Sequence, residues 1–335
     1  MIIDIFRVSV FLIAITLFAE TPPGIRVTLL ALDPDGAPVA GVKVAVGGAP
    51  SASDRAYPRQ ANGETDVDGH FTATITSGDG LMYAFAFGAK HYRTDLPGLD
   101  WQSESENPAK HLKRGKDGIP ECLVKLVVKP IKKPIPLCAK RVDTIVPALG
   151  KPVGYDVEKG DWVAPYGKGE RVDLEFTAMS RFDSDDNYDS ELRLYLPGDA
   201  TGILSYELGS GSGQRSALRM PYEAPEVGYN DKWTWRNTCT TAPGIGQFSV
   251  MVDESKPQRC FFFRVRTVLN PRGDVISAHY GKIHGPVSLR VYADGKTRLE
   301  FTYYFNPTAS DRNLEYDIKR NLIPGLTWEE TPRDP

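Results

Sequence analysis

The chain has 335 residues, 41% of them hydrophobic and 25% charged, which is enough apolar material for the cores of two ordinary domains. Its formal net charge is −3 at pH 7. A nucleic-acid-binding protein carries a basic surface, so we expect no nucleic-acid partner.

An apolar segment lies near the N-terminus, at residues 8–19, interrupted only by Ser9 and Thr16. It is shorter than the about 20 residues that a membrane-spanning helix needs, and it has the length of a signal-peptide core. We therefore predict a signal peptide over residues 1–20 and an exported protein, in the periplasm, at the cell surface or secreted. An uncleaved anchor is the alternative. No later segment is apolar for long enough to span a membrane.

Residues 25–71 contain strands and tight turns. Residues 27–32 form one predicted strand, and residues 41–46 another, with Val42, Val44 and Val46 on one face. The pairs Asp35-Gly36 and Asp68-Gly69 each supply a glycine that tolerates the positive φ of a tight turn. Alternating strands between such turns are typical of a β-sandwich.

Three blocks of this region carry a further pattern. Its residues are Leu32, Asp33, Asp35, Gly36, Pro38, Val39, Gly41, Val42 and Val44, then Thr65, Asp66, Asp68, Gly69 and Phe71, then Gly88 and Tyr92. The pattern, which covers roughly a third of the chain, resembles the carboxypeptidase regulatory-like domain, a transthyretin-like β-sandwich. The resemblance implies a module of seven or so strands with a binding or spacer role and no catalytic residues.

The rest of the first domain is predicted to contain strands at residues 81–87 and 122–129, separated by a long polar loop at 94–118. We place this domain at residues 21–129. Residues 130–141 begin with Pro130, Pro134 and Pro136, and are predicted to be a stiff linker because proline fixes φ and donates no amide hydrogen.

The remaining residues, 142–335, are predicted to be one second domain. Its clearest unit is a hairpin of residues 287–293 and 297–305 around Asp294-Gly295. Further strands are predicted at residues 172–177, 191–196, 202–208, 247–252, 260–268 and 275–280. Their spacing favours a larger sandwich or jelly roll, so the whole chain is predicted to be all-β, with two β-sandwich domains in tandem.

The four cysteines are an even number in a chain that we expect to be exported, which favours disulfides over metal ligation. Three connectivities are open. We expect the local pairs, Cys122 with Cys138 and Cys239 with Cys260, and the alternative is four free buried thiols.

An acidic loop is the candidate metal site. Asp183, Asp185 and Asp189 are spaced so that their oxygens could surround a hard cation such as calcium. A solvated acidic turn is the competing interpretation. The same loop offers carboxylates that a glycosidase could use as acid and base, if two of them stood about 5–10 Å apart across a cleft.

Tyr229, Trp233 and Trp235 are the candidate ligand-binding residues. In an extended segment the two tryptophans share one side, and flat aromatic faces suit sugars or peptides. Core packing is the competing interpretation. His279 and His284 are predicted to lie on opposite faces of one strand, so we expect no shared metal there.

Two functions from different classes fit these features. We expect a non-catalytic exported or surface-associated protein that binds an extracellular glycan or protein, because no catalytic motif of a serine hydrolase, zinc peptidase or nucleotide hydrolase occurs. The alternative is a secreted polysaccharide-active hydrolase with its site in the second domain, for which we identify no catalytic residue. No cofactor besides calcium is expected.

Overall fold

The protein is all-β. The computed structural model describes residues 24–48, 58–76, 80–100, 113–184, 187–208, 215–242, 246–250, 259–292 and 294–335, and these contain strands, turns and no helix. None of them forms a helix with the length and hydropathy that crossing a membrane requires. The predicted signal peptide lies outside the described residues.

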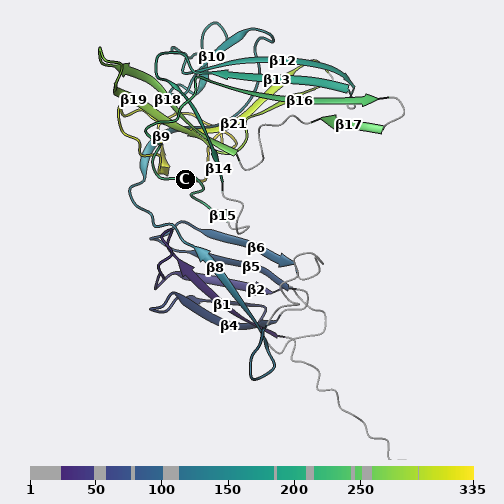
Figure 1. Ribbon diagram of the computed structural model, residues 1–335, viewed down its shortest axis with the longest axis vertical. Helices are drawn as coiled ribbons and strands as arrows, with labels where there is room; N and C mark the ends of the chain where they lie inside the picture. Colours follow the sequence, from purple (N-terminus) through teal and green to yellow (C-terminus); the bar gives the residue numbers. More distant parts are fainter. Residues whose placement is uncertain are drawn as a thin grey trace, which may run out of the picture.

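Two sheets near the N-terminus pack into a first sandwich (Figure 1). One sheet has the order β4-β1-β8-β7, and the other β15-β6-β5-β2-β3. The strands are β1 (Gly24–Leu32), β2 (Lys43–Gly48), β3 (Gln60–Glu64), β4 (His70–Thr76), β5 (Gly80–Phe87), β6 (Thr94–Asp100), β7 (Lys113–Arg114), β8 (Pro120–Val127) and β15 (Arg215–Ser216).

The core of the first sandwich follows from alternation along β1 and β2. Val27 and Leu29 on β1 are buried, as are Val44 and Val46 on β2, and the four belong to one apolar cluster between the sheets. β1 pairs antiparallel with β4 and parallel with β8. Strand β6 lies in the region predicted to be a loop. It escaped prediction because Pro97 and Gly98 interrupt the alternation of apolar and polar residues that indicates a strand.

The second sandwich contains the remaining sheets. One sheet has the order β11-β10-β12-β13-β16-β17. The other, which we call the second sheet, has the order β14-β18-β19-β21-β9-β22, with β20 paired to β21. The strands are β9 (Ile135–Ile145), β10 (Pro152–Asp156), β11 (Asp161–Trp162), β12 (Leu174–Ser184), β13 (Asn187–Tyr195), β14 (Gly202–Glu207), β16 (Lys232–Ala242), β17 (Gly246–Val250), β18 (Arg259–Leu269), β19 (Val275–Ile283), β20 (Ser288–Val291), β21 (Thr297–Asn306) and β22 (Tyr316–Asn321).

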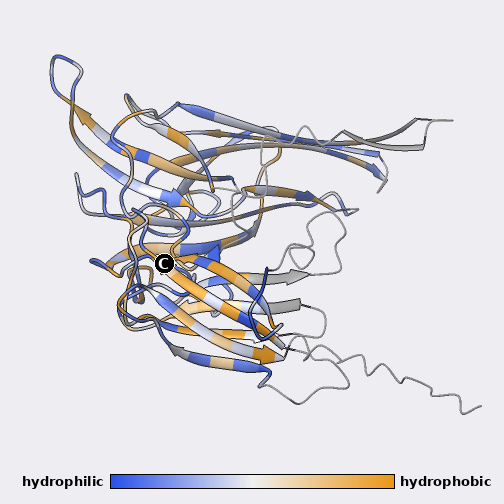
Figure 2. Cartoon of the chain, turned by 60° about the horizontal axis from the view of Figure 1, so that its bottom comes forward, coloured by the Kyte–Doolittle hydropathy of each residue, from blue (hydrophilic) through white to orange (hydrophobic). Residues whose placement is uncertain are grey.

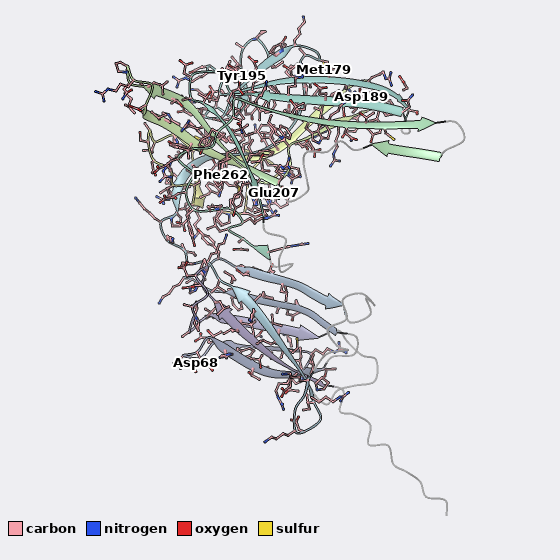
Figure 3. The ribbon with its side chains drawn as sticks, viewed as in Figure 1. Asp68, Met179, Asp189, Tyr195, Glu207 and Phe262 are labelled. Carbon is pink, nitrogen blue, oxygen red and sulfur yellow. The ribbon has the colours of Figure 1, made fainter. Side chains whose placement is uncertain are left out.

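Both faces of the second sheet are covered. Phe261 and Phe263 point into the core between the two sheets, whereas Phe262 belongs to a separate apolar cluster on the other side. We call these sides the inner and the outer face. Figure 3 places Phe262 on the side of the second sandwich nearer the first, away from Tyr195 and Met179. Figure 2 shows apolar and polar residues alternating along many strands, as one-sided burial requires.

The two sandwiches meet at a hydrogen-bonded junction. The side chain of Glu315, 1% exposed, accepts hydrogen bonds from the Tyr92 hydroxyl (2.8 Å) and from the backbone amides of Lys132 (2.8 Å) and Lys133 (2.6 Å). Strand β15 joins β6 nearby, so part of the second domain extends a sheet of the first. Residues 135–141, predicted as linker, lie in β9, and the connection is accordingly shorter than predicted.

The predicted disulfides are wrong for this structure. All four cysteines are free and buried. Cys122 lies in the core of the first sandwich, Cys138 on the inner face of the second sheet, and Cys260 on its outer face, while Cys239 is on β16 in the opposite sheet. Cys122 and Cys138 are therefore in the cores of different sandwiches, and Cys239 and Cys260 are in different sheets. Burial raises the pKa of Cys122, of Cys260 and, to about 12, of Cys138.

Candidate functional site

Trp233 and Trp235 do not form an exposed platform, so that prediction is wrong. They are 7% and 5% exposed, and they face the core of the second sandwich, where Trp233 meets Phe261 edge-on with ring centroids 5.1 Å apart. Their register explains the burial, because they stand opposite Leu194 and Leu192 on β13. Tyr229 is half-buried, and its hydroxyl donates to the Pro225 carbonyl at 2.8 Å.

The described aspartates of the acidic loop are held by basic side chains. Asp189 accepts from Arg236 Nη2 at 2.8 Å and from the Thr238 hydroxyl at 2.7 Å, and the hydrogen bond from Arg236 lowers the pKa of Asp189. Asp183 lies 3.5 Å from Arg181. Asp185 lies outside the described residues. Within the described ranges, no three histidine, cysteine or acidic side chains come together as a metal site would require.

Two adjoining pockets lie instead on the outer face of the second sheet. The first pocket has a volume of about 360 Å³ and the second about 240 Å³. Arg141, His284 and Thr302 line both pockets. Thr302 pairs with Arg141 across β21 and β9, and its carbonyl accepts the backbone amide of His284 at 2.8 Å, so three neighbouring strands supply the shared wall.

A buried lysine lies beside the first pocket. The register aligns Phe262, Lys282 and Tyr304 across β18, β19 and β21, and Lys282 is 1% exposed. Its ammonium group has no hydrogen-bond partner among the described residues and lies 4.7 Å from the centre of the Tyr304 ring. Burial lowers the pKa of Lys282 to about 7.

His284 is an uncharged member of this group. Burial, followed by the charges of Lys282 and Arg219, lowers the pKa of His284 to about 3. Its Nε2 atom is buried and has no hydrogen-bond partner within the described ranges. A neutral imidazole offers one donor and one acceptor, and the His284 side chain lies in the wall of both pockets.

The C-terminal segment, by which we mean residues 322–335, forms one side of the first pocket. Its attachment is polar: the backbone amide of Arg141 donates to the Glu330 carbonyl at 2.7 Å, and the Tyr304 hydroxyl to the Asp334 carbonyl at 2.7 Å. Lys140 forms an ion pair with Glu330 at 3.0 Å. These bonds hold the segment against the edge of the sheet.

The charges in the first pocket are unbalanced. Arg141, Arg219 and Arg333 line it together with Glu329 and Asp334. In the described part of the chain, the guanidinium groups of Arg141 and Arg219 have no ion pair or hydrogen bond. Arg219 is half-buried, which limits its hydration. An unpaired, partly desolvated guanidinium is a strong donor to a carboxylate or a phosphate.

Trp328 is an exposed aromatic side chain, the feature that was predicted at Trp233 and Trp235. It lines the first pocket and is 71% exposed. The Arg333 guanidinium lies 3.2 Å from the centre of its ring, and most of the side chain remains exposed. The sequence analysis missed Trp328 because it stands alone in an irregular segment. The surrounding residues, Gly325 to Pro335, gave only the signal of a turn-rich, polar terminus.

The arrangement can therefore recognise a small molecule by two kinds of contact. Arg141 and Arg219 can hold an anionic group, and Trp328 can stack on a flat, partly apolar surface such as a sugar ring. His284 and Thr302 add hydrogen-bonding groups at the wall that the two pockets share.

Comparisons with known proteins add little. No protein-family model matches the chain, and no curated protein matches it. Among solved structures, the chain is similar to 3-chlorocatechol 1,2-dioxygenase from Rhodococcus opacus 1CP, with 16% identity, a TM-score of 0.26 and coverage of 34% of this chain. The matched part spans 62% of the length of that enzyme. A similarity at this level does not define a common fold.

Proposed function

We propose that this protein is a non-catalytic binding protein that takes a carboxylate-bearing sugar in the first pocket. The observation that carries the proposal is the pair of unpaired guanidinium groups, Arg141 and Arg219, in one pocket beside the exposed ring of Trp328. A uronic acid presents both matching surfaces, a carboxylate for the arginines and an apolar ring face for the tryptophan.

The proposal changes the residues of the sugar site while keeping the class of function expected from the sequence. Trp233 and Trp235 stabilise the core, and Trp328 takes over the role of the aromatic contact. Export remains part of the proposal, and it depends on the apolar segment at residues 8–19. We also propose that the first sandwich is an accessory module of the carboxypeptidase regulatory-like type, on the residue pattern described above.

A hydrolase would need a free acid and a free base in the same groove. Glu300 and Asp143 face each other across β21 and β9 in the second pocket. Each is engaged by an arginine, Glu300 by Arg290 at 3.3 Å and Asp143 by Arg298. Two carboxylates that both have arginine partners do not supply the free acid and base that a glycosidase uses, so we favour binding over hydrolysis.

Glycan binding of the purified protein tests the proposal. On an array of acidic and neutral sugars, glucuronic and galacturonic acid conjugates should be retained and their neutral counterparts should not. Calorimetry with free glucuronic acid then measures the affinity. Arg141→Gln and Arg219→Gln should each weaken binding about 10- to 100-fold, since a hydrogen bond to a charged group contributes about 1.5–3 kcal/mol.

Arg272→Gln is the matched control, because Arg272 is exposed in the turn between β18 and β19, away from both pockets. It should bind as the wild-type protein does. Repeating the titration with calcium and then with a chelator tests the acidic loop separately. Equal retention of neutral and acidic sugars, or unchanged affinity in both pocket variants, would overturn the proposal.

A further inference from the structure

The second pocket is an extension of the first. The two share Arg141, His284 and Thr302, and the second pocket continues along β9, β21 and β20 to Ser288 and Arg290. Its volume of about 240 Å³ is below the range of about 300–1,000 Å³ that is usual for an independent small-molecule site. A ligand that fills the first pocket and continues past Arg141 would enter the second.

The charges of the second pocket differ from those of the first. Arg290 lies 3.3 Å from Glu300, and Asp143 is paired with Arg298, so the charged groups of the second pocket are paired apart from Arg141, which the two pockets share. The half-buried side chain of Ser288 adds a hydroxyl. Such a surface offers hydrogen-bond donors and acceptors to the hydroxyl groups of a ligand and does not require the ligand to be charged. It therefore suits an uncharged sugar ring.

From this contrast we infer that the physiological ligand is an acidic oligosaccharide of at least two units, with its uronic acid in the first pocket and a neutral sugar in the second. The inference rests on the proposed function, and it specifies the class of ligand. Arg141 lies where the two units join, because it lines both pockets.

Calorimetry with two related ligands tests the inference on the purified protein. The probes are glucuronic acid and cellobiouronic acid, in which glucuronic acid is linked to glucose. The disaccharide should bind at least 10-fold more tightly than the monosaccharide. Ser288→Trp, which fills the second pocket, should abolish this gain and leave the affinity for glucuronic acid unchanged.

Arg290→Gln provides a second, milder variant in case the tryptophan disturbs folding. It should reduce the affinity for the disaccharide at least 3-fold without changing that for the monosaccharide. Binding of the disaccharide alone, with no detectable binding of the monosaccharide, would also support the inference. Equal affinities for the two ligands would overturn it and leave the proposed function intact, whereas no binding of either ligand would overturn both.

Discussion

Adjacent residues in each strand of the second sheet point to opposite faces, and the two faces differ in composition. On the inner face, Ile203, Phe263, Gly281, Phe305 and Cys138 form a row across five strands. One residue away, on the outer face, the corresponding row is Leu204, Phe262, Lys282, Tyr304 and Ala139. The inner row is apolar throughout, and the outer row has a lysine at its centre.

The inner face packs the two sheets together, whereas the outer face carries the two pockets. On the inner face, the Phe263 and Phe305 rings are stacked 6.4 Å apart. On the outer face, Lys282 and His284 have buried nitrogen atoms without hydrogen-bond partners in the part of the chain that the structure describes. Buried polar groups of this kind cost stability, and these two lie beside the adjoining pockets.

The largest effect is expected on the inner face. Phe263→Ala should lower the free energy of unfolding by about 3–5 kcal/mol, because it removes a fully buried ring and leaves a cavity above Gly281. Urea unfolding monitored by tryptophan fluorescence measures the loss. Ile276→Ala, at a site 61% exposed, is the control and should change stability by less than about 0.5 kcal/mol. Similar losses in both variants would contradict the assignment of the inner face as core.

On the outer face, Lys282→Met should raise the free energy of unfolding, the opposite of the effect of Phe263→Ala. The pKa of Lys282 is about 7 in the folded protein and near its ordinary 10.5 in the unfolded chain. Between these values the unfolded chain binds more protons, so the stability of the wild-type protein should rise as pH increases from 7 to 10.5. The variant should lose this rise and gain about 2–4 kcal/mol at pH 7. Unfolding midpoints at pH 6, 8 and 10 measure both effects.

A flat pH profile in the wild-type protein would show that Lys282 is not held in the buried, unpaired state described here. Lys296→Met is a suitable control, because Lys296 is exposed and forms an ion pair with Asp294 at the tip of a hairpin. It should leave the pH profile unchanged.

An intermediate effect is expected at the junction that covers part of the outer face. Glu315→Gln keeps the size of the side chain but presents an NH₂ group to backbone amides that need an acceptor. We expect a loss of about 1–3 kcal/mol and faster proteolysis at residues 130–134. Lys319→Gln, at an exposed site on β22, should show neither change, and equal cleavage rates would contradict the role of Glu315.

The smallest effect on stability is expected at Trp328. Trp328→Ala should change the free energy of unfolding by less than about 0.5 kcal/mol, because the side chain is 71% exposed, yet it should weaken uronic acid binding about 5-fold or more. Trp235→Ala is the matched variant from the core and should cost about 3–5 kcal/mol. Unchanged binding in Trp328→Ala would remove the aromatic contact from the proposed site.

Sequence predicted the features that depend on neighbouring residues. Asp33 and Asp66 each accept two backbone amides within their own turns, and Gly36 and Gly69 adopt φ of 87° and 76°, as the Asp-Gly pairs indicated. The hairpin around Asp294-Gly295 is formed by β20 and β21. The all-β class follows from the same local signals and is confirmed.

Register between distant strands is what the sequence could not supply. Trp233 and Trp235 alternate with polar residues, and only their pairing with β13 shows that the tryptophan side is the buried one. Lys282 falls on a buried face because β19 lies between β18 and β21, with further segments covering it. The cysteines were paired by proximity in sequence, whereas the fold places Cys122, Cys138 and Cys260 in three separate apolar clusters.

Glu315 also constrains the order in which the chain can be assembled. The carboxylate that binds the amides of Lys132 and Lys133 stands 183 and 182 positions further along the chain. During synthesis from the N-terminus, β15 can join β6 before the strands that follow it have been made, whereas the bonds of Glu315 can form only when almost the whole second sandwich is present. The hydrogen bonds that Glu315 makes across the junction are therefore a late event, and they mark a polypeptide whose folding is nearly complete.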